Sequence, residues 1–143
     1  MIIRKKYEDL TLNQLYDILQ ARNAVFIVEQ TCPYQDIDGV DPDCTHVMLY
    51  EGEDLKAYAR VFEKRDEPGT AQIGRVLTLE RGKGYGNQVL EECIDCALND
   101  YGMTSMYLEA QVYAVGYYKK HGFQVCSKEF LEDDIPHVQM RRK

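Results

Sequence analysis

The stretch that decides the fold runs from residue 71 to 98 and reads AQIGRVLTLERGKGYGNQVLEECIDCAL. Its first nine residues, 71–79, are rich in β-branched and apolar side chains, as a buried strand is. In its last ten residues, apolar side chains recur at spacings of three and four, which is the pattern of one face of a helix. Between them lies Arg81-Gly82-Lys83-Gly84-Tyr85-Gly86. The stretch therefore predicts a strand, a glycine-rich turn and a helix.

Such a turn is suited to hold a phosphate or diphosphate group. The first amides of a helix have no partner within it, the helix dipole adds positive potential, and glycines lack the Cβ atoms that keep a ligand off the backbone. Two nucleotide-binding motifs are excluded, because Gly82, Gly84 and Gly86 alternate and Asn87-Gln88 follows instead of Lys-Ser/Thr. A tight turn with solvated cations is the alternative interpretation.

The composition predicts a single domain, residues 1–143, without a nucleic-acid or membrane partner. The chain has 24 acidic and 17 basic side chains, a net charge of −7 and a pI near 4.9, whereas nucleic acids and anionic membranes attract cationic surfaces. No apolar run reaches the ~18 residues of a membrane span, and no secretory leader is evident. We therefore expect a cytoplasmic protein.

The five cysteines predict neither disulfides nor a metal site. Their number is odd, and Cys93 and Cys96 form C-x-x-C inside the helix instead of at its start. Cys32, Cys44 and His46 match no zinc template. Reduced thiols and no metal are the expectation.

The rest of the chain predicts a mixed α+β domain. A first helix opens at Thr11, which forms a capping-box pattern with Gln14, and either continues through Phe26 or gives way to a strand at 25–28. The segment 31–45 reads as irregular. The helix after the glycine-rich turn is expected to end near Gly102, and a further short helix is expected at 113–121. Strands are expected at 1–7, 46–50, 55–63, 71–79, 105–110, 123–130 and 138–141. The central strand–helix–strand unit implies one parallel pair in an otherwise antiparallel sheet.

Two motifs resemble those of the GNAT N-acetyltransferase superfamily. Arg81-x-x-Gly84-x-Gly86 is similar to the Gln/Arg-x-x-Gly-x-Gly/Ala turn that holds the diphosphate of acetyl-CoA. Residues 111–123 are similar to the segment Asn-x-x-Ala-x-x-Phe-Tyr-x-x-x-Gly-Phe, with Gln111 in place of Asn and Tyr117 in place of Phe. Segments 25–30, 32–39, 57–60, 73–76 and 132–137 resemble the ElaA-like branch, and Arg22-x-x-Val25-Phe26-x-x-Glu29 has a fainter likeness to acyl-homoserine-lactone synthases.

The resemblance implies the GNAT fold: a mostly antiparallel sheet whose central parallel pair is splayed to admit CoA, flanked by helices. It also implies acetyl-CoA as cosubstrate, with its diphosphate on the turn and its pantetheine arm along the end of the preceding strand. The residues that this predicts at the cosubstrate are Leu77, Thr78, Arg81, Gly82, Lys83, Gly84, Tyr85, Gly86, Asn87 and Gln111.

The resemblance further implies acetyl transfer to a primary amine of a small molecule or peptide by direct attack. Tyr118 is the predicted general acid, because a tyrosine stays protonated at neutral pH. Glu109, Glu29 and His46 are candidate bases, with Glu109 favoured by its place at a strand end; Glu29, Tyr34 and His46 are predicted on the substrate side.

Three alternatives stay open from the sequence. A non-catalytic acyl-CoA sensor could keep the turn, and an acyltransferase of the lactone-synthase kind shares the fold. Edge strands of such a sheet can pair with a second copy, so a homodimer is a further expectation. His137, next to Pro136, is predicted only to pack in a strand.

Overall fold

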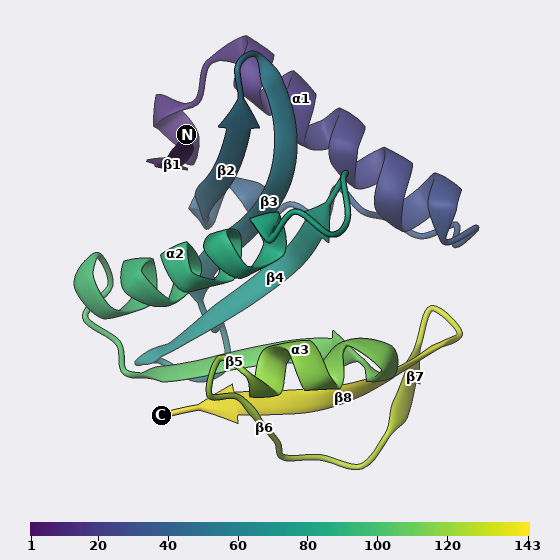
Figure 1. Cartoon of the computed structure of the whole chain (residues 1–143). Helices are drawn as coiled ribbons and strands as arrows, with labels where there is room; N and C mark the ends of the chain where they lie inside the picture. The colour runs from purple at the N-terminus through teal and green to yellow at the C-terminus, as the bar shows by residue number, and fades with distance from the viewer.

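The computed structural model describes all residues, 1–143. Figure 1 shows an open sheet with helices on both faces. The strands are β1 (Ile2–Lys6), β2 (Thr45–Glu51), β3 (Asp54–Glu63), β4 (Thr70–Thr78), β5 (Ser105–Gln111), β6 (Gln124–Val125), β7 (Phe130–Glu132) and β8 (Ile135–Arg142). The α-helices are α1 (Leu12–Arg22), α2 (Tyr85–Asn99) and α3 (Val115–Lys119), with short helical turns η1 (Tyr7–Asp9), η2 (Asn23–Glu29), η3 (Asp41–Asp43) and η4 (Val112–Ala114).

The sheet has the order β1-β2-β3-β4-β5-β8-β6, with β7 paired to β8. Every pair is antiparallel except β4 and β5, which α2 connects. The β4–β5 ladder runs only from Thr70–Ser105 to Gln72–Tyr107, although both strands continue. The predicted mixed fold with one splayed parallel pair is therefore confirmed.

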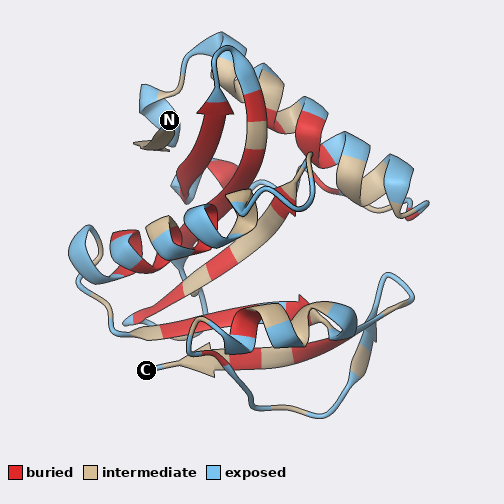
Figure 2. Ribbon diagram, in the orientation of Figure 1, coloured by how far each residue is buried: buried red, intermediate tan, exposed pale blue.

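Two apolar cores lie on opposite faces of the sheet. Along β2, Val47 and Leu49 belong to the larger core, which α2 and α3 cover, while Met48 and Tyr50 point to the smaller core under α1. This alternation is why six of the seven β2 residues are buried (Figure 2). No helix has the length and apolar content needed to cross a membrane.

The first helix begins as predicted and continues further than its α-helical part. Thr11 accepts the amide of Gln14 at 3.0 Å, and the Gln14 side chain accepts the amide of Thr11 at 3.0 Å, so the capping box is confirmed. The helix then passes into η2, a π-helical stretch, and the alternative strand at 25–28 is wrong. Val25 and Phe26 pack on the smaller core from this helical stretch.

The C-terminal strands differ from the prediction. Instead of one strand at 123–130, β6 and β7 are separate, and β8 begins at Ile135. The irregular segment between β6 and β7 is still hydrogen-bonded to the backbone of Gln139 in β8. The Gln139 amide donates to Ser127 Oγ at 2.8 Å, and the Gln139 carbonyl accepts from the Cys126 amide at 2.9 Å. The acidic turn Asp133-Asp134 joins β7 to β8, with both of its residues at positive φ.

Candidate active site

A bulge in β4 accompanies the opening of the sheet. Tyr58 pairs with Leu77, but Arg60 pairs with Gly74, so two residues of β4 face one residue of β3. One of the two, Arg75, has a φ of 53°, in the left-handed region that non-glycine residues seldom adopt. A bulge bends its strand, and this one lies just beyond the last rung that joins β4 to β5.

A cavity of about 790 Å³ is lined by both diverging strands. Its wall also includes the start of α2, the region of η4 and α3, the segment after η2, and the β7–β8 turn. Eight of the residues predicted at the site line it: Tyr34, Leu77, Thr78, Arg81, Gly86, Glu109, Gln111 and Tyr118. The structure thus brings the cosubstrate side, the predicted acid and one predicted base to a single cavity.

The glycine-rich turn leaves backbone amides free. Gly82 (φ 79°) and Gly84 (φ 75°) need the freedom of glycine, and a Cβ at either would meet nothing within 4 Å. Gln88 donates the first amide bond of α2, to Gly84 O at 3.2 Å, so the amides of the three preceding residues lack helical partners. The donors and the open space fit a diphosphate group.

Gly86 has a different role, which is packing. A Cβ there would lie 3.2 Å from Thr78 Cγ2 and 3.3 Å from the hydroxyl of Tyr117, which donates to the Gly86 carbonyl. Gly86 therefore lets α2 start close to both β4 and α3.

Several predicted residues lie outside the cavity lining. Lys83 is exposed in the turn together with Gly82 and Gly84, while Tyr85 packs against the larger core. The Asn87 side chain lies 3.0 Å from His121, and Glu29 pairs with Arg81 at 2.8 Å. Glu29 thus reaches the cavity only through the arginine of the turn.

His46 is removed from the candidate site. The imidazole is fully buried and absent from the cavity lining, with Nδ1 2.6 Å from the Tyr58 hydroxyl and Nε2 3.0 Å from the Asp41 carbonyl. A neutral ring that donates from Nε2 and accepts at Nδ1 satisfies both contacts. Burial lowers the pKa of His46. The sequence could not separate this buried role from one at the substrate.

The lowered pKa predicts an acid-sensitive stability. The folded state holds His46 neutral, whereas an unfolded histidine takes up a proton near pH ~6.5, so its contribution is present above that pH and is lost below it. We expect the free energy of unfolding, measured in urea between pH 7.5 and 5, to fall by up to ~1.4 kcal/mol per pH unit from this residue.

A His46→Gln variant isolates the effect, because every other titrating group is common to both proteins. Its stability should be lower at pH 7.5 and should depend less on pH. Parallel pH profiles for the two proteins would refute this assignment.

The Tyr118 hydroxyl is poised without a partner. The residue is 8% exposed and lines the cavity, and its hydroxyl has no hydrogen bond within the protein. Tyr117 and Phe123 hold its ring by edge contacts at 4.9 and 6.2 Å between centroids. Burial raises the pKa of Tyr118, which keeps the hydroxyl protonated.

Glu109 shares its face of the sheet with two residues that sequence reasoning did not place at the site. His137 of β8 pairs with Gln111 of β5 on one side and with Phe130 of β7 on the other. Side chains two residues apart on a strand share a face, so Glu109 lies on the face of Gln111 and Glu132 lies on the face of Phe130. All of them project on the face opposite the larger core. Both Glu132 and His137 line the cavity. The segment 132–137 had been singled out by its resemblance, which is the signal that pointed to this region.

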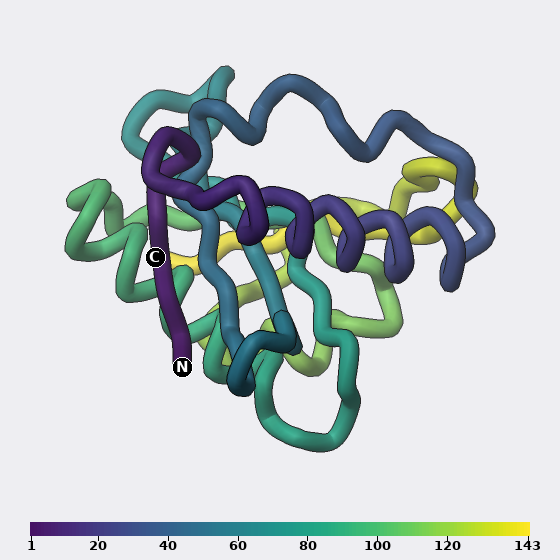
Figure 3. Tube along the Cα trace, turned by 90° about the horizontal axis from the view of Figure 1, so that it is seen from above, coloured from purple at the N-terminus to yellow at the C-terminus, as the bar shows by residue number.

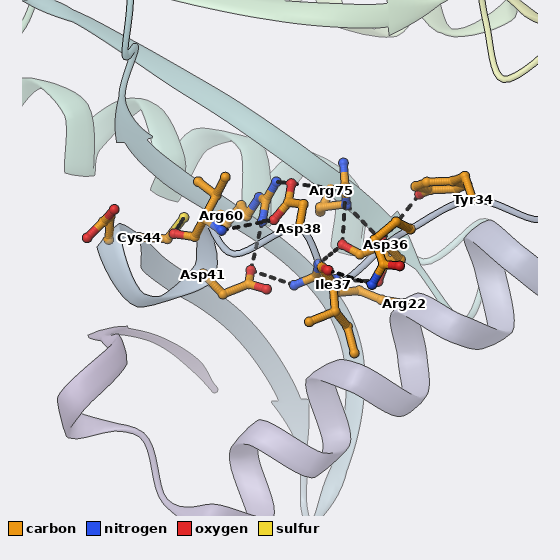
Figure 4. A network of polar contacts seen from close by, with 12 residues as sticks. Arg22, Tyr34, Asp36, Ile37, Asp38, Asp41, Cys44, Arg60 and Arg75 are labelled. Atoms are coloured by element: carbon orange, nitrogen blue, oxygen red, sulfur yellow. Dashed lines mark hydrogen bonds and ion pairs between the residues drawn. The ribbon is translucent and has the colours of Figure 1, made fainter.

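A closed ring of six alternating charges fixes another wall (Figure 4). In order, its members are Arg22, Asp36, Arg75, Asp38, Arg60 and Asp41. At its buried end, Asp41 Oδ1 accepts from Arg22 at 2.7 Å and from Arg60 at 2.8 Å, and both arginines are at most 3% exposed. The two arginines hold the pKa of Asp41 below its ordinary value.

At its other end, the ring ties the irregular segment after η2 to the bulge. Arg75 donates to Asp36 Oδ1 at 2.8 Å and lies 3.3 Å from Asp38 Oδ2. Its guanidinium also lies over the Tyr34 ring, at 5.5 Å. Figure 3 shows this segment running back beside α1, so three aspartates that read as loop residues position one side of the cavity.

Comparison with known proteins agrees with this architecture. The family model described as "Acetyltransferase (GNAT) domain" matches residues 8–143. The chain belongs to the GNAT acetyltransferase family. It is 38% identical to Protein ElaA of Escherichia coli (strain K12), over 96% of this chain and 92% of that protein. A crystal structure of Escherichia coli ElaA superposes with a TM-score of 0.91 at 36% identity, and covers both chains completely. The crystal structure of an acyl-CoA N-acyltransferase from Pseudomonas aeruginosa has a TM-score of 0.93 at 40% identity, over 100% of this GNAT chain and 99% of the other.

Proposed function

We propose that this GNAT protein transfers the acetyl group of acetyl-CoA to a primary amine within a ternary complex. The observation that carries the proposal is the shared cavity: free amides at the start of α2, the open edge of β4 and the unpartnered hydroxyl of Tyr118 all border it or adjoin it. GNAT membership supports acyl transfer as the reaction class. A sensor that only bound acyl-CoA would have no use for an unpaired tyrosine hydroxyl in the cavity.

The residues that would hold the cosubstrate lie along a continuous path. The diphosphate would take the amides of Gly82 to Asn87, with Arg81 as the nearby cation. The pantetheine arm would run along Leu77 and Thr78, where β4 has no partner on its β5 side. Bound acetyl-CoA supplies an activated acyl group, a thioester.

The chemistry then needs a base and an acid from the chain. The amine must lose its ammonium proton before it can attack, and Glu109 in the cavity lining is the proposed base. The departing sulfur needs a proton, and Tyr118 is the proposed donor. Tyr118 has a raised pKa, but a thiolate in the same buried surroundings also has a raised affinity for a proton.

The test is calorimetric titration with acetyl-CoA, beside S-acetylpantetheine, which lacks the diphosphate. We expect acetyl-CoA to bind and the truncated compound to bind far more weakly. Arg81→Ala should weaken acetyl-CoA binding about tenfold, the loss of one charge-assisted contact. Arg65→Ala is the matched control, since Arg65 is similarly exposed and lies outside the cavity lining.

Equal affinity for both compounds would remove the turn as the diphosphate site. Absence of binding would remove the proposed reaction with it. Binding without thiol release over a broad amine panel would establish the sensor instead.

A further inference from the structure

Both arginines in the cavity lining already have acidic partners. The ring of six charges contains three arginines and three aspartates, and Arg75, the one arginine of the ring that lines the cavity, pairs with two of the aspartates (Figure 4). Arg81, the other arginine in the lining, pairs with Glu29. Arg75 is therefore balanced within the ring, while the exposed Arg81 lies at the glycine-rich turn, on the side of the cavity proposed for the diphosphate.

Three other carboxylates in the lining have no such partner. Glu109, Glu132 and Asp133 form no ion pair with lysine or arginine, and Glu132 lies 3.6 Å from His137 Nε2. Glu109 accepts one hydrogen bond, from the Tyr107 hydroxyl at 2.8 Å. The side of the cavity formed by β5, β7 and β8 therefore gathers three acidic side chains that no lysine or arginine pairs with.

Glu109 and Glu132 act on each other directly. The register places them on the same face of the sheet, and burial, followed by the neighbouring Glu109 carboxylate, raises the pKa of Glu132. Two adjacent carboxylates repel unless a proton or a cation lies between them. No lysine or arginine pairs with either carboxylate, and the one basic group in contact is the His137 imidazole, so a cationic ligand would relieve the repulsion within this pair.

An independent observation places a ligand in the same cavity. The Tyr118 residue is more than nine-tenths buried and lines the cavity, and its hydroxyl has no hydrogen-bond partner in the protein. Buried polar groups are normally paired, so this hydroxyl awaits a partner from a bound molecule. The carboxylate pair would therefore receive the amine, and the Tyr118 hydroxyl would contact the thioester bound beside it.

The segment after η2 closes the side of the cavity that carries Glu109 and Glu132. The Gln30 side chain meets that of Gln111 at 3.2 Å, and Cys32 Sγ lies 3.3 Å from the Asp133 carbonyl. These contacts join the segment to β5 and to the β7–β8 turn, leaving a cavity of about 790 Å³ that must also admit the pantetheine arm. The remaining space suits a small amine.

From these features we propose that the acceptor is a small aliphatic diamine or polyamine, a cation without a carboxylate, whose reacting ammonium group is received by Glu109 and Glu132. The proposal rests on the acetyl-transfer function above and names its acceptor class. An ammonium group offsets the charge of the pair, whereas a carboxylate on the acceptor, as in an amino acid, would add to the repulsion.

The proton balance follows from the same residues. The carboxylate pair takes one proton from R–NH₃⁺, and the nitrogen lone pair then forms the C–N bond to the acetyl carbon. The C–S bond breaks, and the sulfur leaves with its electron pair and takes the Tyr118 proton. The second nitrogen proton restores Tyr118, and the pair releases its proton to solvent, so the products are the acetamide, the CoA thiol and one proton.

The experiment compares amines that differ only by a carboxylate, with release of CoA thiol as the readout. Cadaverine is compared with lysine, and putrescine with ornithine. Lysine amide is included because it has an uncharged carboxamide where lysine has its carboxylate. We expect kcat/KM for each diamine to exceed that of its amino acid by at least about tenfold, with lysine amide close to cadaverine.

Two variants attribute the preference to the pair. Glu132→Gln should lower kcat/KM for cadaverine and reduce its advantage over lysine to about threefold or less. Glu129→Gln removes the same charge from an exposed site outside the cavity lining and should keep the full preference.

The outcomes separate this inference from the proposed function. Turnover of amino acids as fast as diamines, or an unchanged preference in Glu132→Gln, would overturn the acceptor class alone. Bound acetyl-CoA without turnover of any amine would overturn acetyl transfer and the acceptor class together.

Discussion

Replacing Asp41 by asparagine should lower the free energy of unfolding by about 3–5 kcal/mol, the usual cost of removing one partner from a buried ion pair. One oxygen of Asp41 accepts from both Arg22 and Arg60, at 2.7 and 2.8 Å. Asparagine keeps the shape of aspartate but removes its negative charge. The three arginines of the ring would then face only two carboxylates, and the two buried guanidinium groups would lose the carboxylate that they share. Arg60 would be affected most, because its Nε atom is already buried without a hydrogen-bond partner and a second unpaired group would be added.

The measurement is urea denaturation followed by circular dichroism at pH 7. Asp43→Asn is the matched control: it lies two residues away, and its pair with Arg65 is exposed, with side chains 70% and 60% accessible. Such a pair contributes about 0–1 kcal/mol. If Asp41→Asn lost no more stability than Asp43→Asn, the ring would be a surface feature and not the anchor of the cavity wall.

The ring also marks the limit of what the sequence could predict. The capping box at Thr11, the strand–turn–helix around Gly84 and the parallel pair are set by short-range patterns, and all were confirmed. The ring joins residues 14 to 39 positions apart, so no local period records it. A run of aspartates between Tyr34 and Cys44 reads as a loop until the arginines that meet it are known.

The same reasoning explains the outcome at the site. Tyr118 and the glycine turn lie in contiguous motifs, and both could be assigned to one cavity by their resemblance. Glu132 and His137 enter the cavity through the pairing of β5, β8 and β7, which depends on a break in what looked like one strand. His46 failed as a candidate because burial depends on tertiary packing, and the residue type carries no sign of it.

Replacing Tyr118 by phenylalanine should lower kcat for acetyl transfer by about 10²–10³-fold, within the range of one lost general acid. The departing CoA sulfur would have to take its proton from solvent, which the buried setting of residue 118 restricts. The ring would stay in place, since its contacts with Tyr117 and Phe123 involve only the aromatic faces and edges. The hydroxyl has no partner to lose, so stability should be unchanged or slightly higher.

Three readouts distinguish this role from a structural one. Stopped or continuous thiol assays give kcat, calorimetry gives the Kd for acetyl-CoA, and denaturation gives stability; only kcat should change. Tyr16→Phe, on the exposed face of α1, removes a hydroxyl outside the cavity lining and should leave all three as they are. An unaltered kcat in Tyr118→Phe would exclude this residue as the proton donor, and the unpaired hydroxyl would then belong to substrate positioning. A parallel rise in the Kd for acetyl-CoA would point the same way, because a proton donor to the leaving sulfur acts after the cosubstrate has bound.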